Sequence, residues 1–114
     1  MISKELIMKI LDYPNGVESV CQDGDGILIL SATKLHDDIY DIYNLAHRCK
    51  EWANDSEYFR IETGKPYSYN NDAKYWYHIY DGHMSCEKVH NGFEKTEPEA
   101  IFKACEWLLN EGKR

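Results

Sequence analysis

The chain has 114 residues, a formal net charge of −7, and 43% apolar and 29% charged residues. This length suits a single domain, residues 1–114, and this balance excludes a disordered chain. No apolar run approaches the roughly 20 residues that cross a bilayer, and Lys4, Glu5 and Lys9 interrupt the apolar start that a signal peptide would need. We therefore expect a cytoplasmic protein that makes no membrane contact.

The negative charge is concentrated in one part of the chain. Residues 12–62 hold eleven acidic and four basic residues, and the rest of the chain is balanced. An acidic segment disfavours direct binding to nucleic acid, because phosphates are bound by Lys and Arg. It favours a partner with a basic surface, or serves solubility alone.

Residues 2–11 carry apolar side chains at helical spacing, and the turn residues 13–16 follow. Residues 17–22 and 27–32 are short strand-like runs, and the Asp-Gly repeat at 23–26 predicts the hairpin turn between them. A long helix is predicted over residues 37–53, with Asp37 and Asp38 in a first turn where the helix dipole favours negative charge. Its expected buried positions are Ile39, Ile42, Tyr43, Ala46, Cys49 and Ala53. Its expected exposed positions are Asp37, Asp41, Asn44, Arg48, Glu51 and Asp55.

Strands are predicted at residues 57–63, 67–69, 73–80 and 83–89. Asp81-Gly82 would form a two-residue hairpin turn between the last two, and Asn91-Gly92 would end the final strand. A closing helix is expected over residues 97–110, because Thr96 and Glu99 form a capping box and Pro98 fits a first turn. Its expected buried positions are Ile101, Ala104, Cys105 and Leu108.

These elements predict an α+β fold: a mostly antiparallel sheet of about five strands flanked by three helices, in the order α-β-β-α-β-β-β-α. We expect the helices to cover both faces of the sheet. The four cysteines, at positions 21, 49, 86 and 105, form no CxxC pair and are predicted to be free thiols that pack as small apolar residues.

His78, His83, Cys86 and His90 are dense enough to suggest zinc. The two-residue turn would pair Tyr80 with His83, which sets Cys86 on the opposite face from His78. We therefore predict no metal site. The Asp-Gly repeat at 23–26 lacks the Glu that a calcium loop requires, and His47 and Cys49 point in different directions on a helix. No catalytic motif and no cofactor site are predicted, so we expect no enzyme.

Six aromatic residues fall within residues 67–80, and strand alternation sets Trp76, His78 and Tyr80 on one face, with His83 beside them. A covering helix would bury this patch. Left uncovered, it would form an aromatic surface of the kind that anchors protein interfaces.

Residues 96–105, TEPEAIFKAC, resemble the closing helix of small phage-encoded proteins of the phage ABA-sandwich group, and residues 3–11 resemble their opening helix. The resemblance implies a helix–sheet–helix sandwich and a phage or prophage origin. It assigns no catalytic or binding residue.

The leading hypothesis is a non-catalytic acidic protein of a phage or mobile element that masks a host protein with a basic surface, as anti-CRISPR and other anti-defence proteins do. Asp37, Asp41 and Glu51 would form its contact surface. One alternative is a small-ligand or nucleotide-binding module built on the aromatic hairpin, residues 67–89. Another is a structural phage accessory protein that forms a homodimer or larger homo-oligomer.

Overall fold

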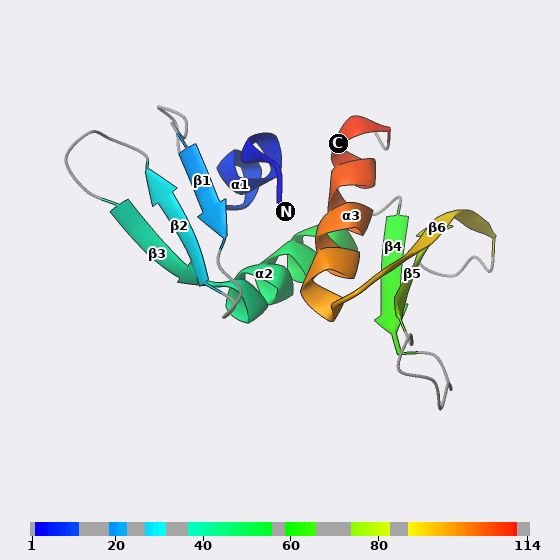
Figure 1. Ribbon diagram of the computed structural model, residues 1–114. Coiled ribbons are helices and arrows are strands. Elements are labelled where there is room, and N and C mark those ends of the chain that lie inside the picture. The colour runs from blue at the N-terminus through cyan, green and yellow to red at the C-terminus, as the bar shows by residue number, and fades with distance from the viewer. Residues whose placement is uncertain are drawn as a thin grey trace.

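The computed structural model describes residues 2–11, 19–22, 27–31, 37–55, 59–65, 74–82 and 87–111. Within these ranges the chain forms three helices and six strands, which confirms the α+β class (Figure 1). None of the helices in these ranges is both long and apolar enough to span a bilayer. The elements are α1 Lys4–Leu11, β1 Ser19–Gln22, β2 Ile27–Ser31, β3 Asp37–Asp41, α2 Ile42–Asn54, β4 Phe59–Gly64, β5 Tyr75–Asp81, β6 Lys88–Glu94 and α3 Glu97–Asn110.

The strands form two antiparallel sheets of three, ordered β1-β2-β3 and β4-β5-β6, instead of one sheet of about five. The predicted pairing of the first two strands is confirmed, with Val20 opposite Leu30. Residues 37–41 add a third strand to that pair, with Ile39 opposite Ile29. α2 follows β3 directly, and the next three strands form a second sheet. The two sheets lie at opposite ends of the helices (Figure 1).

The start predicted for the second helix was wrong. Residues 37–41 are a strand, and Asp41 is the N-cap of α2. Its carboxylate accepts hydrogen bonds from the backbone N–H groups of Tyr43 at 2.7 Å and Asn44 at 3.2 Å. Asp41 therefore supplies the hydrogen-bond acceptor for the free N–H groups of the first turn. Asp37 and Asp38, which were expected in that turn, lie in β3 instead.

Asp41→Ala should lower the free energy of unfolding by about 1 kcal/mol, because two N–H groups lose their acceptor. Asp41→Asn is the matched control and should retain most of the stability, since asparagine caps equally well. Urea unfolding of the three proteins measures the difference. An equal loss in both variants would show that charge, and not capping, is the contribution of Asp41.

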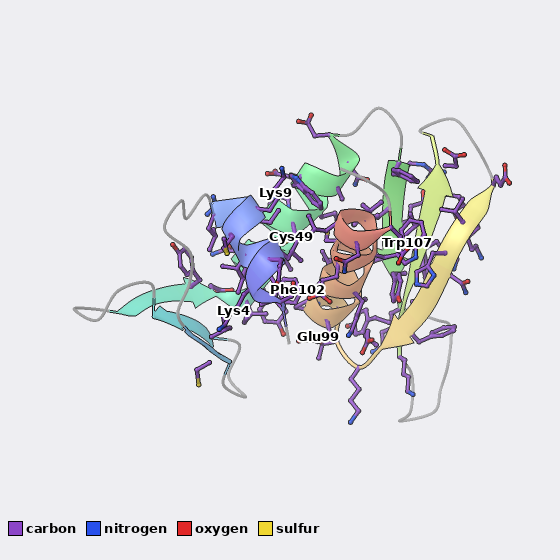
Figure 2. All side chains as sticks on the ribbon, turned by 90° about the horizontal axis from the view of Figure 1, so that it is seen from above. Lys4, Lys9, Cys49, Glu99, Phe102 and Trp107 are labelled. Atoms are coloured by element: carbon purple, nitrogen blue, oxygen red, sulfur yellow. The ribbon has the colours of Figure 1, made fainter. Side chains whose placement is uncertain are left out.

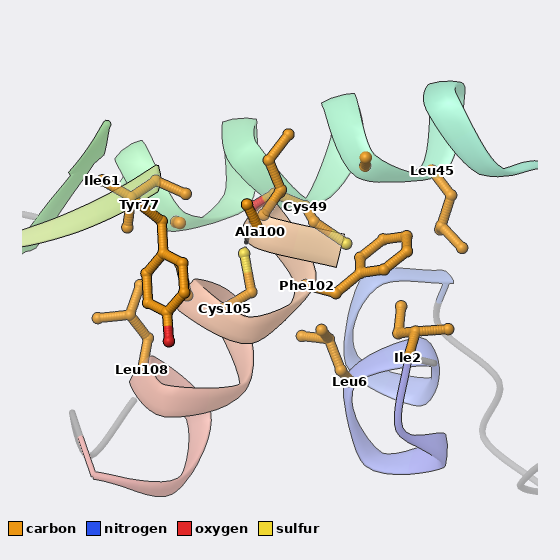
Figure 3. Packing of buried hydrophobic residues seen from close by; sticks show 14 of the residues in the cluster. Ile2, Leu6, Leu45, Cys49, Ile61, Tyr77, Ala100, Phe102, Cys105 and Leu108 are labelled. Atoms are coloured by element: carbon orange, nitrogen blue, oxygen red, sulfur yellow. Dashed lines mark hydrogen bonds between the residues drawn. The ribbon is translucent and has the colours of Figure 1, made fainter. Parts of the chain in front are cut away.

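One hydrophobic core joins the three helices to the second sheet (Figure 3). Four of the residues predicted to be buried in this helix are buried, namely Ile42, Ala46, Cys49 and Ala53. Tyr43 was also predicted to be buried but is 65% exposed. Leu45 was not predicted and is a core residue. The buried members of α2 are Ile42, Leu45, Ala46, Cys49 and Ala53.

The closing helix follows its prediction closely. The Thr96 hydroxyl accepts a hydrogen bond from the Glu99 N–H at 3.3 Å, and Pro98 lies in the first turn. The four predicted core residues are buried, and so is Phe102.

Three cysteines lie within the described ranges, and all three are free thiols. Cys49 and Cys105 are core residues as predicted, and the Cys105 thiol donates to the Cys49 carbonyl oxygen at 3.3 Å. Cys21 is exposed, so the prediction of a core role was wrong for this residue. Cys86 falls outside the described residues, as do the predicted turns at 13–16 and 23–26 and the strand at 67–69.

The second predicted hairpin has a different register. β6 begins at Lys88, which lies opposite Tyr80, and Asn91 lies opposite His78. Gly82, with φ of 88°, therefore starts a connection longer than two residues. The predicted end at Asn91-Gly92 was also wrong, because both residues lie inside β6.

Candidate functional site

Among the described elements, the helices pack on one face of the second sheet. Ile61, Tyr77 and Ile79 are buried on that face against α2 and α3. His90 of β6 stacks on Trp107 of α3 with ring centroids 5.2 Å apart. Among the described residues no helix packs on the opposite face, so the expectation of helices on both faces was wrong for this sheet (Figure 2).

We call the uncovered side of this sheet the open face. Its residues follow from the strand register, because directly paired residues share a face. Trp76, His78 and Tyr80 of β5 are half-buried along its centre, as the alternation predicted, and Phe93 of β6 is 59% exposed. The open face comprises Arg60, Glu62, Gly64, Trp76, His78, Tyr80, Lys88, Asn91 and Phe93.

The aromatic side chains of the open face hold one another in place. Trp76 and His78 stack with ring centroids 4.4 Å apart, and His78 Nδ1 lies 3.1 Å from the Tyr80 hydroxyl. The Arg60 guanidinium lies 4.2 Å from the centroid of the Tyr80 ring and forms an ion pair with Glu62. These contacts restrain the rings, and side chains that are already restrained lose less conformational entropy in any further contact.

Two glycines on the outer strands accommodate aromatic rings from β5. Gly64 lies directly opposite Trp76, and a Cβ at Gly64 would collide with the indole. Gly92 lies opposite Tyr77 on the covered face, and a Cβ there would collide with the phenol ring. The rings thus replace the packing that glycine lacks, an arrangement known to stabilise edge strands. Gly64 in this way fixes the position of Trp76 on the open face.

Burial lowers the pKa of His78 below its ordinary value, the Lys88 ammonium lowers it further, and Glu62 opposes the shift. The neutral imidazole is therefore favoured in the fold. A neutral ring suits both the stack on Trp76 and the contact with the Tyr80 hydroxyl.

This pKa shift predicts a pH dependence of stability. The unfolded state takes up the proton at about pH 6.5, where His is normally half-protonated, while the folded state resists it. The free energy of unfolding should therefore be at its full value above that pH and fall as the pH drops below it. His78→Gln should flatten the fall between pH 7 and about pH 5, measured by urea unfolding. An unchanged slope in this variant would contradict the assignment.

A hollow of about 560 Å³ lies beside the open face, between α2 and the outer edge of β4. Trp76 forms part of its wall, and Lys50 and Arg60 supply two cations. The Lys50 ammonium donates to the Thr63 hydroxyl at 3.4 Å. The hollow is lined by Lys50, Asn54, Arg60, Ile61, Glu62, Thr63 and Trp76.

The three acidic residues proposed as a contact surface do not share a helix face. Asp37 belongs to β3, and Asp41 is occupied in capping α2. Glu51 is exposed on α2, and its carboxylate lies 3.0 Å from His47 Nε2. Asp37 and Asp41 therefore lie on a different element from Glu51.

The histidines of the candidate zinc cluster lie on different faces of the second sheet. His78 lies on the open face, whereas His90 lies on the covered face with Tyr77, 3.4 Å from its hydroxyl. These two side chains cannot bind one ion. In the ranges that the structure describes there is no group of three or more His, Cys, Asp or Glu side chains able to hold a metal. His83 and Cys86 fall outside those ranges.

Sequence reasoning identified the central strand of the open face but missed Arg60, Gly64 and Phe93. These residues enter the site only through the register of β4 and β6 on β5. From Phe59 to Glu62 apolar and charged residues alternate, which was a local signal for this part of the face.

No protein-family model, no curated protein and no solved structure matches this chain.

Proposed function

We propose that this is a non-catalytic binding protein that docks a partner protein on its open face. The observation that carries the proposal is a three-stranded sheet with helices on one side and with Trp76, His78 and Tyr80 in mutual contact on the other. Trp, Tyr and Arg are the residues that most often anchor protein interfaces, and Arg60 lies against Tyr80.

The net charge of −7 favours a partner with a basic surface, since long-range attraction would steer the encounter. The biological setting that we propose is a phage or mobile element, where masking a host protein would serve an anti-defence role similar to that of anti-CRISPR proteins.

The open face is a better docking surface than the acidic residues. Replacing Asp41 would remove a helix cap, so a loss of binding in that variant would report on folding. Glu51→Lys tests the charge contribution without this complication, because Glu51 is exposed and caps nothing.

The hollow beside Trp76 favours a second candidate, a small anion that carries a planar ring, such as a nucleotide. Its ring would pack near the indole, and Lys50 and Arg60 would meet its charge. A ligand of this kind would lose affinity with Lys50→Ala, whereas a protein docked on the open face would not depend on Lys50.

The experiment is capture of partners from a lysate of the host bacterium, followed by affinity measurement with the captured protein. Trp76→Ala and Tyr80→Ala should each weaken binding at least about thirtyfold, as for anchor residues at an interface centre. Tyr43→Ala is the matched control, because Tyr43 is an exposed aromatic on α2, away from the open face. Undiminished affinity in both open-face variants would refute the proposal. A loss confined to Trp76→Ala and Lys50→Ala would favour the small ligand.

A further inference from the structure

The outer edge of β4, which faces away from β5, borders the hollow of about 560 Å³. Along the described chain no other strand pairs with this edge. The β4 residues that line the hollow come from both faces of the sheet. Ile61 and Thr63 belong to the covered face, and Arg60 and Glu62 belong to the open face. The hollow therefore runs along the strand edge itself, where an edge strand presents its backbone N–H and C=O groups.

The backbone groups of Thr63 point outward from the sheet. The Ile61 N–H donates to the Asn54 side-chain oxygen of α2 at 2.8 Å, so Ile61 directs its backbone groups away from β5. In an antiparallel pair, every second residue of a strand directs its N–H and C=O to the same side. The pairing of β4 with β5 is regular from Phe59 to Gly64, so Thr63 also directs its N–H and C=O outward. The edge at Thr63 thus offers the donor and the acceptor that an added strand requires.

Asn54 limits how far an added strand can extend. Its side chain occupies the Ile61 N–H, so a strand that pairs at Thr63 cannot go on to pair at Ile61. A segment antiparallel to β4 would run from Gly64 towards Ile61, so the end that approaches Asn54 is its C-terminus. The edge therefore suits the end of a chain better than a continuous strand.

A positive charge lies where that chain end would arrive. The Lys50 ammonium donates to the Thr63 hydroxyl at 3.4 Å. The other two charged residues of the lining, Arg60 and Glu62, form an ion pair with each other. The excess cation of the hollow is therefore Lys50, which attracts a terminal carboxylate. A parallel segment would bring an N-terminal ammonium to the same place, and like charges repel.

We propose that the hollow binds the C-terminal residue of an extended peptide segment of another protein, at a site separate from the docking surface of the open face. One oxygen of the terminal carboxylate accepts the Thr63 N–H, and the other meets the Lys50 ammonium. The N–H of the same peptide residue donates to the Thr63 C=O. Strand addition to a sheet edge and capture of a terminal carboxylate by backbone groups are both recurring modes of peptide recognition.

The penultimate residue of the segment contacts Trp76. It lies opposite Gly64, and directly paired residues share a face, so its side chain is on the side of the open face. The Trp76 indole lies over Gly64 and forms part of the wall of the hollow. The site therefore prefers a large apolar side chain at the penultimate position.

Hexapeptide pools with an N-terminal fluorophore and a large apolar penultimate residue test this inference by fluorescence anisotropy with the full chain. Peptides with a free carboxylate should bind at least about tenfold more tightly than the same peptides with a terminal carboxamide, which carries no charge. Lys50→Gln should abolish this preference, and Lys50→Arg should retain it. Lys65→Gln is the matched control, because Lys65 is an exposed cation outside the lining of the hollow.

A backbone substitution tests the contribution of the strand edge. Thr63→Pro removes an N–H that β5 does not use, and proline is tolerated at such positions of an edge strand. This variant should bind the free-carboxylate peptides at least about tenfold more weakly, because the carboxylate loses its backbone donor. Thr63→Val keeps the N–H and should retain most of the affinity. Circular dichroism reports whether each variant is folded, and Lys50→Gln provides the test if Thr63→Pro is not.

Equal binding of the two pools, or a preference for the free carboxylate that survives both Lys50→Gln and Thr63→Pro, would overturn the inference. Binding of adenosine monophosphate without binding of either pool would also overturn it and would assign the hollow to the nucleotide. Docking on the open face depends on Tyr80, which does not line the hollow, so this inference and the proposed function can fail independently.

Discussion

Replacing Phe102 by alanine should lower the free energy of unfolding by about 3–5 kcal/mol, the largest effect we expect from a single substitution in this chain. Phe102 is 1% exposed. Its ring extends from α3 into the space between Leu45 of α2 and Leu6 of α1 (Figure 3). Alanine would leave a cavity that three helices line and that none can fill alone. A loss of this size is a large share of the roughly 5–15 kcal/mol typical of a domain.

Urea unfolding followed by circular dichroism measures the effect. Phe102→Leu keeps most of the volume and should cost far less than alanine. Tyr43→Ala is the surface control, because Tyr43 is 65% exposed and its replacement should change stability by less than about 0.5 kcal/mol. A Phe102→Ala loss no larger than that of the surface control would show that the three helices do not share one core.

The closing helix was predictable because its signals are local. Thr96 and Glu99 lie three residues apart and make the contact that the capping box predicts. Phe102 was missed because α3 packs against α1 and α2 as well as against the sheet, so its buried surface is wider than one stripe. That width depends on elements far away in the sequence.

Residues 37–41 were mispredicted because two local preferences compete there. Aspartates before an apolar run favour a helix start, and Ile39 and Tyr40 favour a strand. Pairing with β2, along the five residues Ile27 to Ser31, decides the outcome. A single sequence does not display that long-range pairing, so the predicted helix wrongly included the five residues of β3.

The register of β6 was mispredicted for a related reason. Asp81-Gly82 and Asn91-Gly92 are both strong turn signals, and nothing local distinguishes them. Gly92 instead sits under the Tyr77 ring inside a strand, a cross-strand contact that exists only after the sheet has formed. The alternation of Trp76, His78 and Tyr80 survived this error, because it depends on β5 alone.

Gly64→Ala should disable the open face while leaving every aromatic residue in place. The new Cβ would occupy the space of the Trp76 indole, which must then move away from its stack on His78. Overpacking of this kind costs about 1–3 kcal/mol of unfolding free energy. Partner binding should weaken as well, because the ring no longer lies where the open face holds it. Tryptophan fluorescence and near-ultraviolet circular dichroism report the movement, and urea unfolding reports the cost.

A second substitution shows whether Gly64→Ala acts by displacing the Trp76 indole or by disturbing β4 itself. Trp76→Phe in the Gly64→Ala background replaces the indole by a smaller ring, which leaves room for the new Cβ. The double variant should therefore lose less stability than the two single losses added together, because the two residues are in direct contact. Strict additivity would mean that the alanine acts on β4 itself and that Gly64 does not position Trp76.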